Sequence, residues 1–181
     1  TYRFVAVSPW RRTTGVPSDV IADHERFWTY VRSRSEDVRA DVRLADGERI
    51  IAGGRTLRAV WRPGHSTTDT LFVDDDARIA FTGDHLLARI SSNTEIHATD
   101  RAEDGRARSR VRYLDGLRRT ARMPLDRLLT GHGAPVTQPA RLVDARLRDH
   151  RRRCERILAI LADGPSTAYG IARHLWPPRT V

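Results

Sequence analysis

Apolar side chains recur with the spacing of amphipathic helices in four parts of the chain. The pattern predicts helices over residues 17–33, 106–122, 142–161 and 166–176. Ser18 or Asp19 can cap the first helix, and Ser166 or Thr167 can cap the last. The consecutive residues Gly164-Pro165 end the third helix, since neither residue suits a helix interior.

Between residues 42 and 84 the period changes to that of β-strands. The stretch ERIIAGGRTLRAVW alternates or runs apolar on both sides of two glycines, which predicts a hairpin. A second hairpin follows in TLFVDDDARIAFTGD, with its turn at the three aspartates 74–76. Two more stretches have strand character: LDRLLTGHG, bounded by proline and glycine, and YRFVAVSP at residues 2–9, which also suits a lead-in loop.

Length and composition describe an ordinary globular chain. Its 181 residues suffice for one core, with or without a small appended unit, and 39% of them are hydrophobic and 30% charged. No apolar run approaches the length of a membrane span and no signal-peptide pattern is seen, so we expect a cytoplasmic protein without a membrane partner. The single cysteine, Cys154, cannot form an internal disulfide.

The formal net charge of +9 comes with 32 basic residues, all of them arginine. Arginine binds phosphates and carboxylates well, so nucleic acid is one partner that the charge allows. The complete absence of lysine indicates coding bias in a GC-rich genome instead, and we favour that interpretation over a selected nucleic-acid surface.

Three apolar strands each run into a glycine followed by a histidine or an aspartate. The stretches are AVWRPGH with His65, IAFTGD with Asp84 and LDRLLTGHG with His132. Glycine lets the backbone turn sharply, which frees the next side chain to project beyond the sheet edge. Imidazole and carboxylate are ligands of zinc and similar metals, so the three side chains together predict a metal site.

The motifs PGHS, FTGDHLL and LLTGHG, in this order, resemble the later metal motifs of the metallo-β-lactamase superfamily, and especially its glyoxalase II-like branch with a helical tail. The resemblance implies an α/β protein with the superfamily's αββα sandwich, incomplete at its N-terminus, over residues 1–138. Residues 139–181 would form the helical tail, the start of a winged-helix-like extension. By the same resemblance, His65 would bind the first zinc ion, Asp84 would bridge two ions as the catalytic carboxylate, and His132 would bind the second.

The superfamily's HxHxDH motif, which supplies the other ligands, does not occur in the sequence. Its nearest match, Asp23-His24, would put an aspartate and an isoleucine where the leading histidines belong, and it lies mid-helix. Two ligands per ion remain, which predicts weak zinc binding and little turnover. We expect the chain to be the later part of a longer enzyme, with a degenerate homologue, or an unusual site completed by His85 or His97, as alternatives.

The resemblance implies a hydrolase that cleaves a small-molecule thioester or ester with a zinc-bound hydroxide. His85 and Asn93, which follow the bridging aspartate, would lie on the substrate side. An endoribonuclease of the same superfamily and a non-catalytic interaction module are the alternatives, and the protein could form a homodimer.

Overall fold

A computed structural model of the chain describes residues 14–36, 38–94 and 108–176. Residues 2–9, for which the sequence allows a strand or a lead-in loop, lie outside these ranges, as do His97 and the first residues of the helix expected from 106. The described elements are α2 (Ser18–Ser33), β1 (Arg49–Ala52), β2 (Arg55–Trp61), β3 (Thr70–Asp74), β4 (Ile79–Gly83), α3 (Ser109–Ala121), β5 (Arg127–Thr130), α4 (Pro139–Ala162) and α5 (Ala168–Leu175).

The chain divides into two compact units. One comprises Val42–Asp149, and the other comprises Thr1–Asp41 together with His150–Val181. The division falls within α4, between Asp149 and His150, and the domain boundary expected at residues 138 and 139 stays a prediction.

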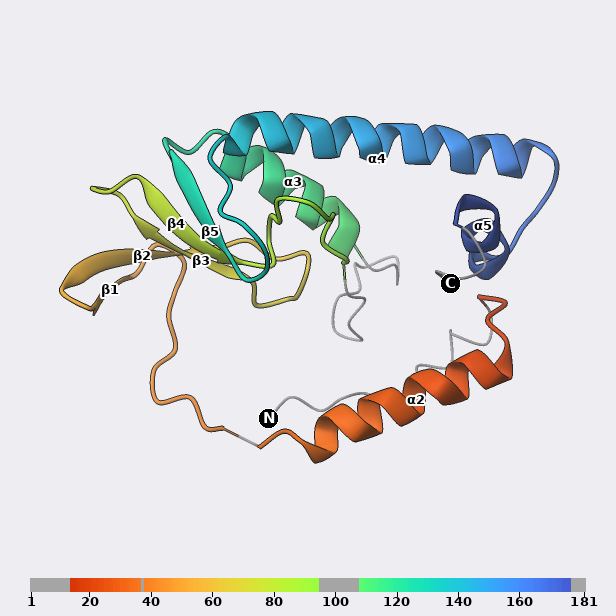
Figure 1. Cartoon of the computed structure of the whole chain (residues 1–181), viewed down its shortest axis with the longest axis horizontal. Coiled ribbons are helices and arrows are strands. Elements are labelled where there is room, and N and C mark those ends of the chain that lie inside the picture. The colour runs from red at the N-terminus through yellow and green to blue at the C-terminus, as the bar shows by residue number, and fades with distance from the viewer. Residues whose placement is uncertain (1–13, 37, 95–107, 177–181) are drawn as a thin grey trace. The chain divides into compact units, whose positions relative to one another are not determined.

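The larger unit is built on a five-stranded sheet in which β1 to β5 lie side by side in chain order (Figure 1). The first four strands pair antiparallel as two hairpins, as the sequence predicts. Gly53 and Gly54 both have positive φ angles, 58° and 75°, which the tight turn between β1 and β2 requires. β5 pairs parallel to β4, so the two strands end at the same edge of the sheet.

The hydrophobic core lies against one face of the sheet. Val60, Leu71, Val73, Ala80 and Leu128 lie on this face, because residues two apart on a strand point the same way. They pack against Tyr113, Leu114 and Leu117 of α3 and against Val143 of α4, all of them buried. Helices packed on a mostly antiparallel sheet confirm the predicted α/β class.

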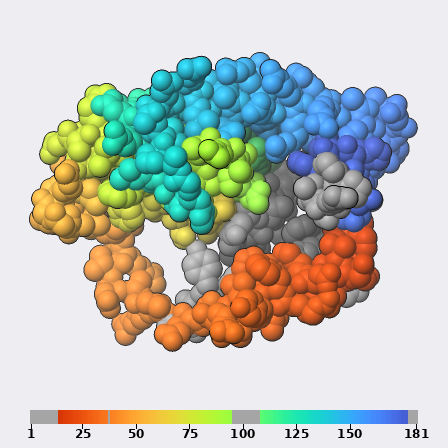
Figure 2. All heavy atoms as spheres, in the orientation of Figure 1, coloured from red at the N-terminus to blue at the C-terminus, as the bar shows by residue number. Residues whose placement is uncertain are grey.

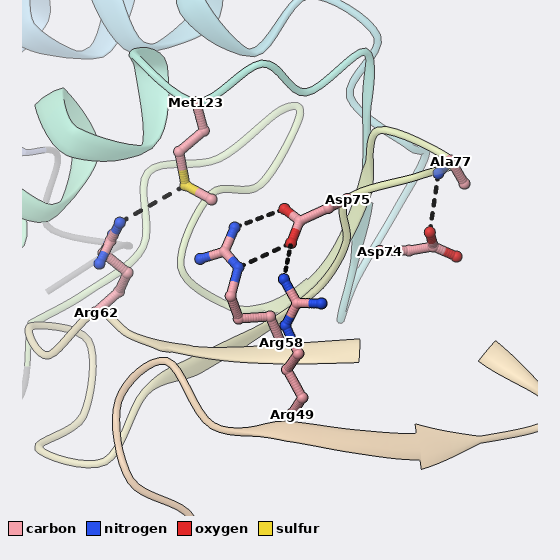
Figure 3. Close-up of polar contacts among 7 residues, drawn as sticks. All are labelled: Arg49, Arg58, Arg62, Asp74, Asp75, Ala77 and Met123. Carbon is pink, nitrogen blue, oxygen red and sulfur yellow. Dashed lines mark hydrogen bonds and ion pairs between the residues drawn. The ribbon is translucent and has the colours of Figure 1, made fainter. Parts of the chain in front are cut away.

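Ion pairs hold the turn between β3 and β4 (Figure 3). Arg58 on β2 donates two hydrogen bonds to Asp75, at 2.9 and 2.6 Å, and this guanidinium lowers the pKa of the Asp75 carboxyl. Asp74 accepts a hydrogen bond from the backbone N–H of Ala77 at 2.8 Å. β3 ends at Asp74 and β4 begins at Ile79, so the turn comprises residues 75–78 and not the predicted aspartates 74–76. It ends at Arg78, whose φ of 55° is left-handed.

The smaller unit contains α2, α5 and the second half of α4. The expected side-chain cap of α2 by Ser18 or Asp19 is wrong: the helix already includes both residues, and Pro17, with no side chain that could accept a hydrogen bond, is its N-cap residue. The predicted cap of α5 is confirmed, because the Thr167 hydroxyl accepts a hydrogen bond from the N–H of Gly170 at 3.1 Å. No helix in the described part of the chain is long and apolar enough to span a membrane.

Candidate metal centre

His65, Asp84 and His132 each follow a strand of the sheet. Asp84 and His132 are brought to the same edge by the parallel pairing of β4 and β5, which the hydrogen bond from Gly131 N–H to the Gly83 carbonyl continues at 2.7 Å. Figure 2 shows the turquoise atoms of β5 beside the yellow-green atoms of the segment that follows Asp84. Residues separated by almost fifty positions thus share one surface.

The three side chains meet at the carboxylate of Asp84. Its Oδ2 lies 3.7 Å from Nε2 of His65 and 3.5 Å from Nε2 of His132. The His65 and Asp84 side chains are 26% and 28% exposed, whereas that of His132 is 74% exposed, so solvent reaches the group from the His132 side.

Two glycines permit this arrangement. Gly83 has a φ of 49°, which turns the backbone at the end of β4 immediately before Asp84. At Gly131 a Cβ atom would lie 2.6 Å from Oδ1 of Asp84, so any side chain there would displace the carboxylate. The glycines noted in the sequence therefore have two roles, a turn at one strand end and close approach at the other.

The loop that carries His65 is fixed on both sides. Asp69 accepts hydrogen bonds from the backbone N–H and the hydroxyl of Ser66, at 3.1 and 2.7 Å, which closes a tight turn after the histidine. Before it, Gly64 approaches α3 so closely that a Cβ atom would lie 2.5 Å from the Cα of Tyr113. The loop therefore packs closely against the core.

His65 and the predicted substrate-side residue Asn93 are in contact through the backbone. Nδ1 of His65 lies 2.8 Å from the carbonyl oxygen of Asn93, and the Asn93 side chain is exposed. A carbonyl oxygen only accepts hydrogen bonds, so Nδ1 carries the proton. In the neutral ring Nε2 then has a free lone pair, and this is the nitrogen nearest to Asp84.

His85, the other residue expected on the substrate side, is fully buried. Its Nε2 lies 3.0 Å from the Thr120 hydroxyl of α3, and its ring packs edge-on against Tyr113. Burial, with the charge of Arg62 as a smaller cause, lowers the pKa of His85 to about 3, so the ring is neutral. With no exposed surface, the ring reaches no ligand outside the core.

Three residues outside the predicted set support the site. The Ser92 hydroxyl donates a hydrogen bond to the backbone carbonyl of Asp84. Tyr113 forms a side-chain hydrogen bond with Ser92. Arg146 of α4 donates from Nη2 to three carbonyls of the segment after Asp84, those of Leu87, Ala88 and Ile90, at 3.1, 3.2 and 3.1 Å. Sequence pattern offers no signal for Arg146, because it is one of many arginines on its helix.

The donor types and their spacing suit a transition metal such as zinc. A tetrahedral ion with ligand bonds of about 2.1 Å separates neighbouring ligand atoms by about 3.4 Å, close to the two distances found here. Within residues 14–36, 38–94 and 108–176, however, no group of three His, Cys, Asp or Glu side chains could hold a metal ion. The described residues thus present two pairs of donors that share Asp84, and each pair is smaller than the set of three that a catalytic zinc ion needs.

The sequence profile of the metallo-beta-lactamase superfamily matches residues 5–132, and the chain belongs to this superfamily. It is 31% identical over 115 residues, which are 64% of this chain and 36% of the relative, to the probable metallo-hydrolase YqjP of Bacillus subtilis. It is 30% identical over 118 residues to an atrochrysone carboxyl ACP thioesterase of Aspergillus fumigatus, covering 65% of this chain and 25% of that enzyme.

Among solved structures, the fold is similar to that of a metallo-beta-lactamase family protein from Thermus thermophilus, with a TM-score of 0.69 and 30% identity. The similarity covers 78% of this chain and 45% of that protein. The chain thus spans less than half the length of each of these three proteins.

Proposed function

We propose that this chain carries the later metal ligands of a metal-dependent hydrolase that cleaves thioesters or esters. The observation that carries the proposal is the placement of the Asp84 carboxylate between two imidazole nitrogens, at 3.7 and 3.5 Å. Superfamily membership supports it independently of this geometry. Zinc is the proposed metal, since two imidazoles and a carboxylate are a donor set that it accepts.

Each of the three residues has a distinct part. Asp84 would bridge two ions, because its carboxylate faces both histidines, and His65 and His132 would each bind one of the ions through Nε2. When bound, the metal would supply Lewis-acid polarisation of the substrate carbonyl. The exposed side of the site, at His132, leaves room for a substrate to approach. Since the described donors form only pairs, we expect weak zinc binding and little turnover by this polypeptide.

The thioester class is supported by the Aspergillus fumigatus relative, which is named as a thioesterase acting on an acyl carrier protein. An ester substrate uses the same carbonyl chemistry. The glyoxalase II-like branch, a cytoplasmic location and a homodimer remain predictions from the sequence.

Zinc titration by calorimetry tests the metal site. We expect weak binding to the unaltered chain, no measurable binding to Asp84→Asn, and weakened binding to His65→Ala and His132→Ala. His174→Ala on α5 is the matched control, because it removes an imidazole from the other unit. Zinc binding that is unchanged in Asp84→Asn would contradict the proposed site.

Hydrolysis of an acyl-coenzyme A thioester tests the reaction class. We expect any turnover to be slow, to disappear with a chelator and to be absent from Asp84→Asn. An endoribonuclease is the second candidate, and the net charge of +9 is compatible with RNA as its substrate. A single-stranded RNA that binds with steep salt dependence and is cleaved faster than the thioester would favour this second candidate.

A further inference from the structure

Two consecutive residues, Ser92 and Asn93, contact two members of the candidate metal centre, Asp84 and His65. Ser92, which is 5% exposed, donates its hydroxyl hydrogen bond to the carbonyl of Asp84. Asn93 accepts the hydrogen bond from Nδ1 of His65, at 2.8 Å. The pair of residues therefore connects the loop after β2, which carries His65, to the loop after β4, which carries Asp84.

The contact with Asn93 fixes which nitrogen of His65 is protonated. A free neutral imidazole prefers its proton on Nε2, so the Nδ1–H form has to be selected by a fixed acceptor. The carbonyl of Asn93 is such an acceptor, and the selected form leaves the Nε2 lone pair directed to the side of Asp84. A ring with the opposite tautomer would present an N–H to that side and could not bind a metal through Nε2.

The side chain of Ser92 also contacts that of Tyr113 on α3. The Ser92 hydroxyl donates to the Asp84 carbonyl, and the Ser92 side chain also interacts with the Tyr113 hydroxyl. Tyr113 is 1% exposed and is part of the hydrophobic core on α3, which makes it a rigid support. Burial raises the pKa of Tyr113, so its hydroxyl stays protonated at neutral pH.

We propose that the Ser92-Asn93 pair is a positioning unit that sets the His65 tautomer and the Asp84 backbone together. This inference rests on the proposed function, because the tautomer matters when Nε2 binds a metal. It gives Asn93 a role through its backbone carbonyl, and the Asn93 side chain is not required. Ser92 is a positioning residue, and it keeps the Asn93 carbonyl in place by anchoring the adjacent residue.

Nitrogen NMR of the histidine-labelled chain reads the tautomer directly, with a chelator present and at a pH well above the ordinary imidazole pKa of about 6.5. We expect His65 to be in the Nδ1–H form in the unaltered chain. In Ser92→Ala we expect the Nδ1–H share to fall by about half or more, since the Asn93 carbonyl loses its anchor. Asn93→Ala is the matched control: it removes the side chain, keeps the carbonyl, and should leave the tautomer unchanged.

Zinc affinity is the second measurement, and Ser92→Ala should lower it about tenfold, as loss of a group that orients a ligand does in other metal sites. An Nε2–H form of His65 in the unaltered chain, or an unchanged tautomer in Ser92→Ala, would overturn the inference. If Ser92→Ala does not fold, Tyr113→Phe removes only the hydroxyl below Ser92 and must shift the tautomer in the same direction. The tautomer is measured without metal, so this test of the Ser92-Asn93 pair can succeed or fail independently of the proposed hydrolase function.

Discussion

The buried imidazole of His85 predicts that the chain loses stability as the pH falls through the range of ordinary histidines. In the folded chain burial lowers the pKa of His85 to about 3, from the ordinary value of 6.5 that applies after unfolding. Between about pH 6.5 and about pH 3, His85 therefore binds a proton in the unfolded chain but not in the folded chain. The stability that this group contributes is fully present above pH 6.5 and is lost as the pH falls toward 3.

The size of the effect follows from this difference in pKa. Each pH unit below about 6.5 costs up to about 1.4 kcal/mol, because one proton is taken up on unfolding. Between about pH 7.5 and about pH 5, the free energy of unfolding should fall by about 2 kcal/mol from His85 alone. His85→Gln cannot titrate, so this part of the loss should disappear in the variant, whatever its stability at neutral pH.

Urea unfolding with a chelator present, at the two pH values, measures the difference for each protein. His174→Gln replaces an exposed imidazole by the same side chain and should keep the large pH difference of the unaltered chain. The reasoning is refuted if the unaltered chain and His85→Gln lose equal stability between the two pH values.

Three further substitutions test the scaffold around the site. Arg146→Ala removes three hydrogen bonds from a charged donor and should cost about 2–3 kcal/mol in urea unfolding, with the segment after Asp84 gaining amide exchange; Arg141→Ala, exposed on the same helix, should cost far less. Gly64→Ala places a methyl group against the backbone of Tyr113 and should lower the melting temperature by more than about 5 °C. Gly131→Ala should abolish zinc binding with a smaller loss of stability, because its methyl group displaces the Asp84 carboxylate; an unchanged affinity would show that the carboxylate is not a ligand.

Local patterns account for the parts of the fold that the sequence could predict. Two adjacent glycines between alternating apolar residues specify the β1–β2 hairpin, and the structure confirms it. The sequence wrongly predicts a side-chain cap for α2, because Ser18 and Asp19 already lie within the first helical turn. Between β3 and β4 the turn lies at residues 75–78, whereas the sequence predicts it at 74–76. The difference arises because Arg78 adopts a left-handed conformation, which glycine and asparagine adopt more readily.

Sequence pattern selects the three residues of the candidate site but does not predict their geometry. Glycine before His65, Asp84 and His132 marks strand ends, yet the parallel pairing of β4 with β5 that joins two of them is a long-range contact without a local signal. Burial of His85 follows from packing against α3, which pattern alone does not reveal. The carbonyl of Asn93 is equally invisible to sequence reasoning, because every residue has one.

The two halves of α4 belong to different units, and Arg146 lies in the first half. The first half, through residue 149, belongs to the larger unit, and from it Arg146 donates hydrogen bonds to three carbonyls of the segment after Asp84. Protein engineers who shorten this chain from its C-terminal side should therefore cut beyond Arg146, and preferably beyond residue 149. A cut before Arg146 would remove its hydrogen bonds to the three carbonyls, and the segment after Asp84 would be held less firmly. Arg146 lies within residues 139–181, which the sequence alone predicts to be a tail.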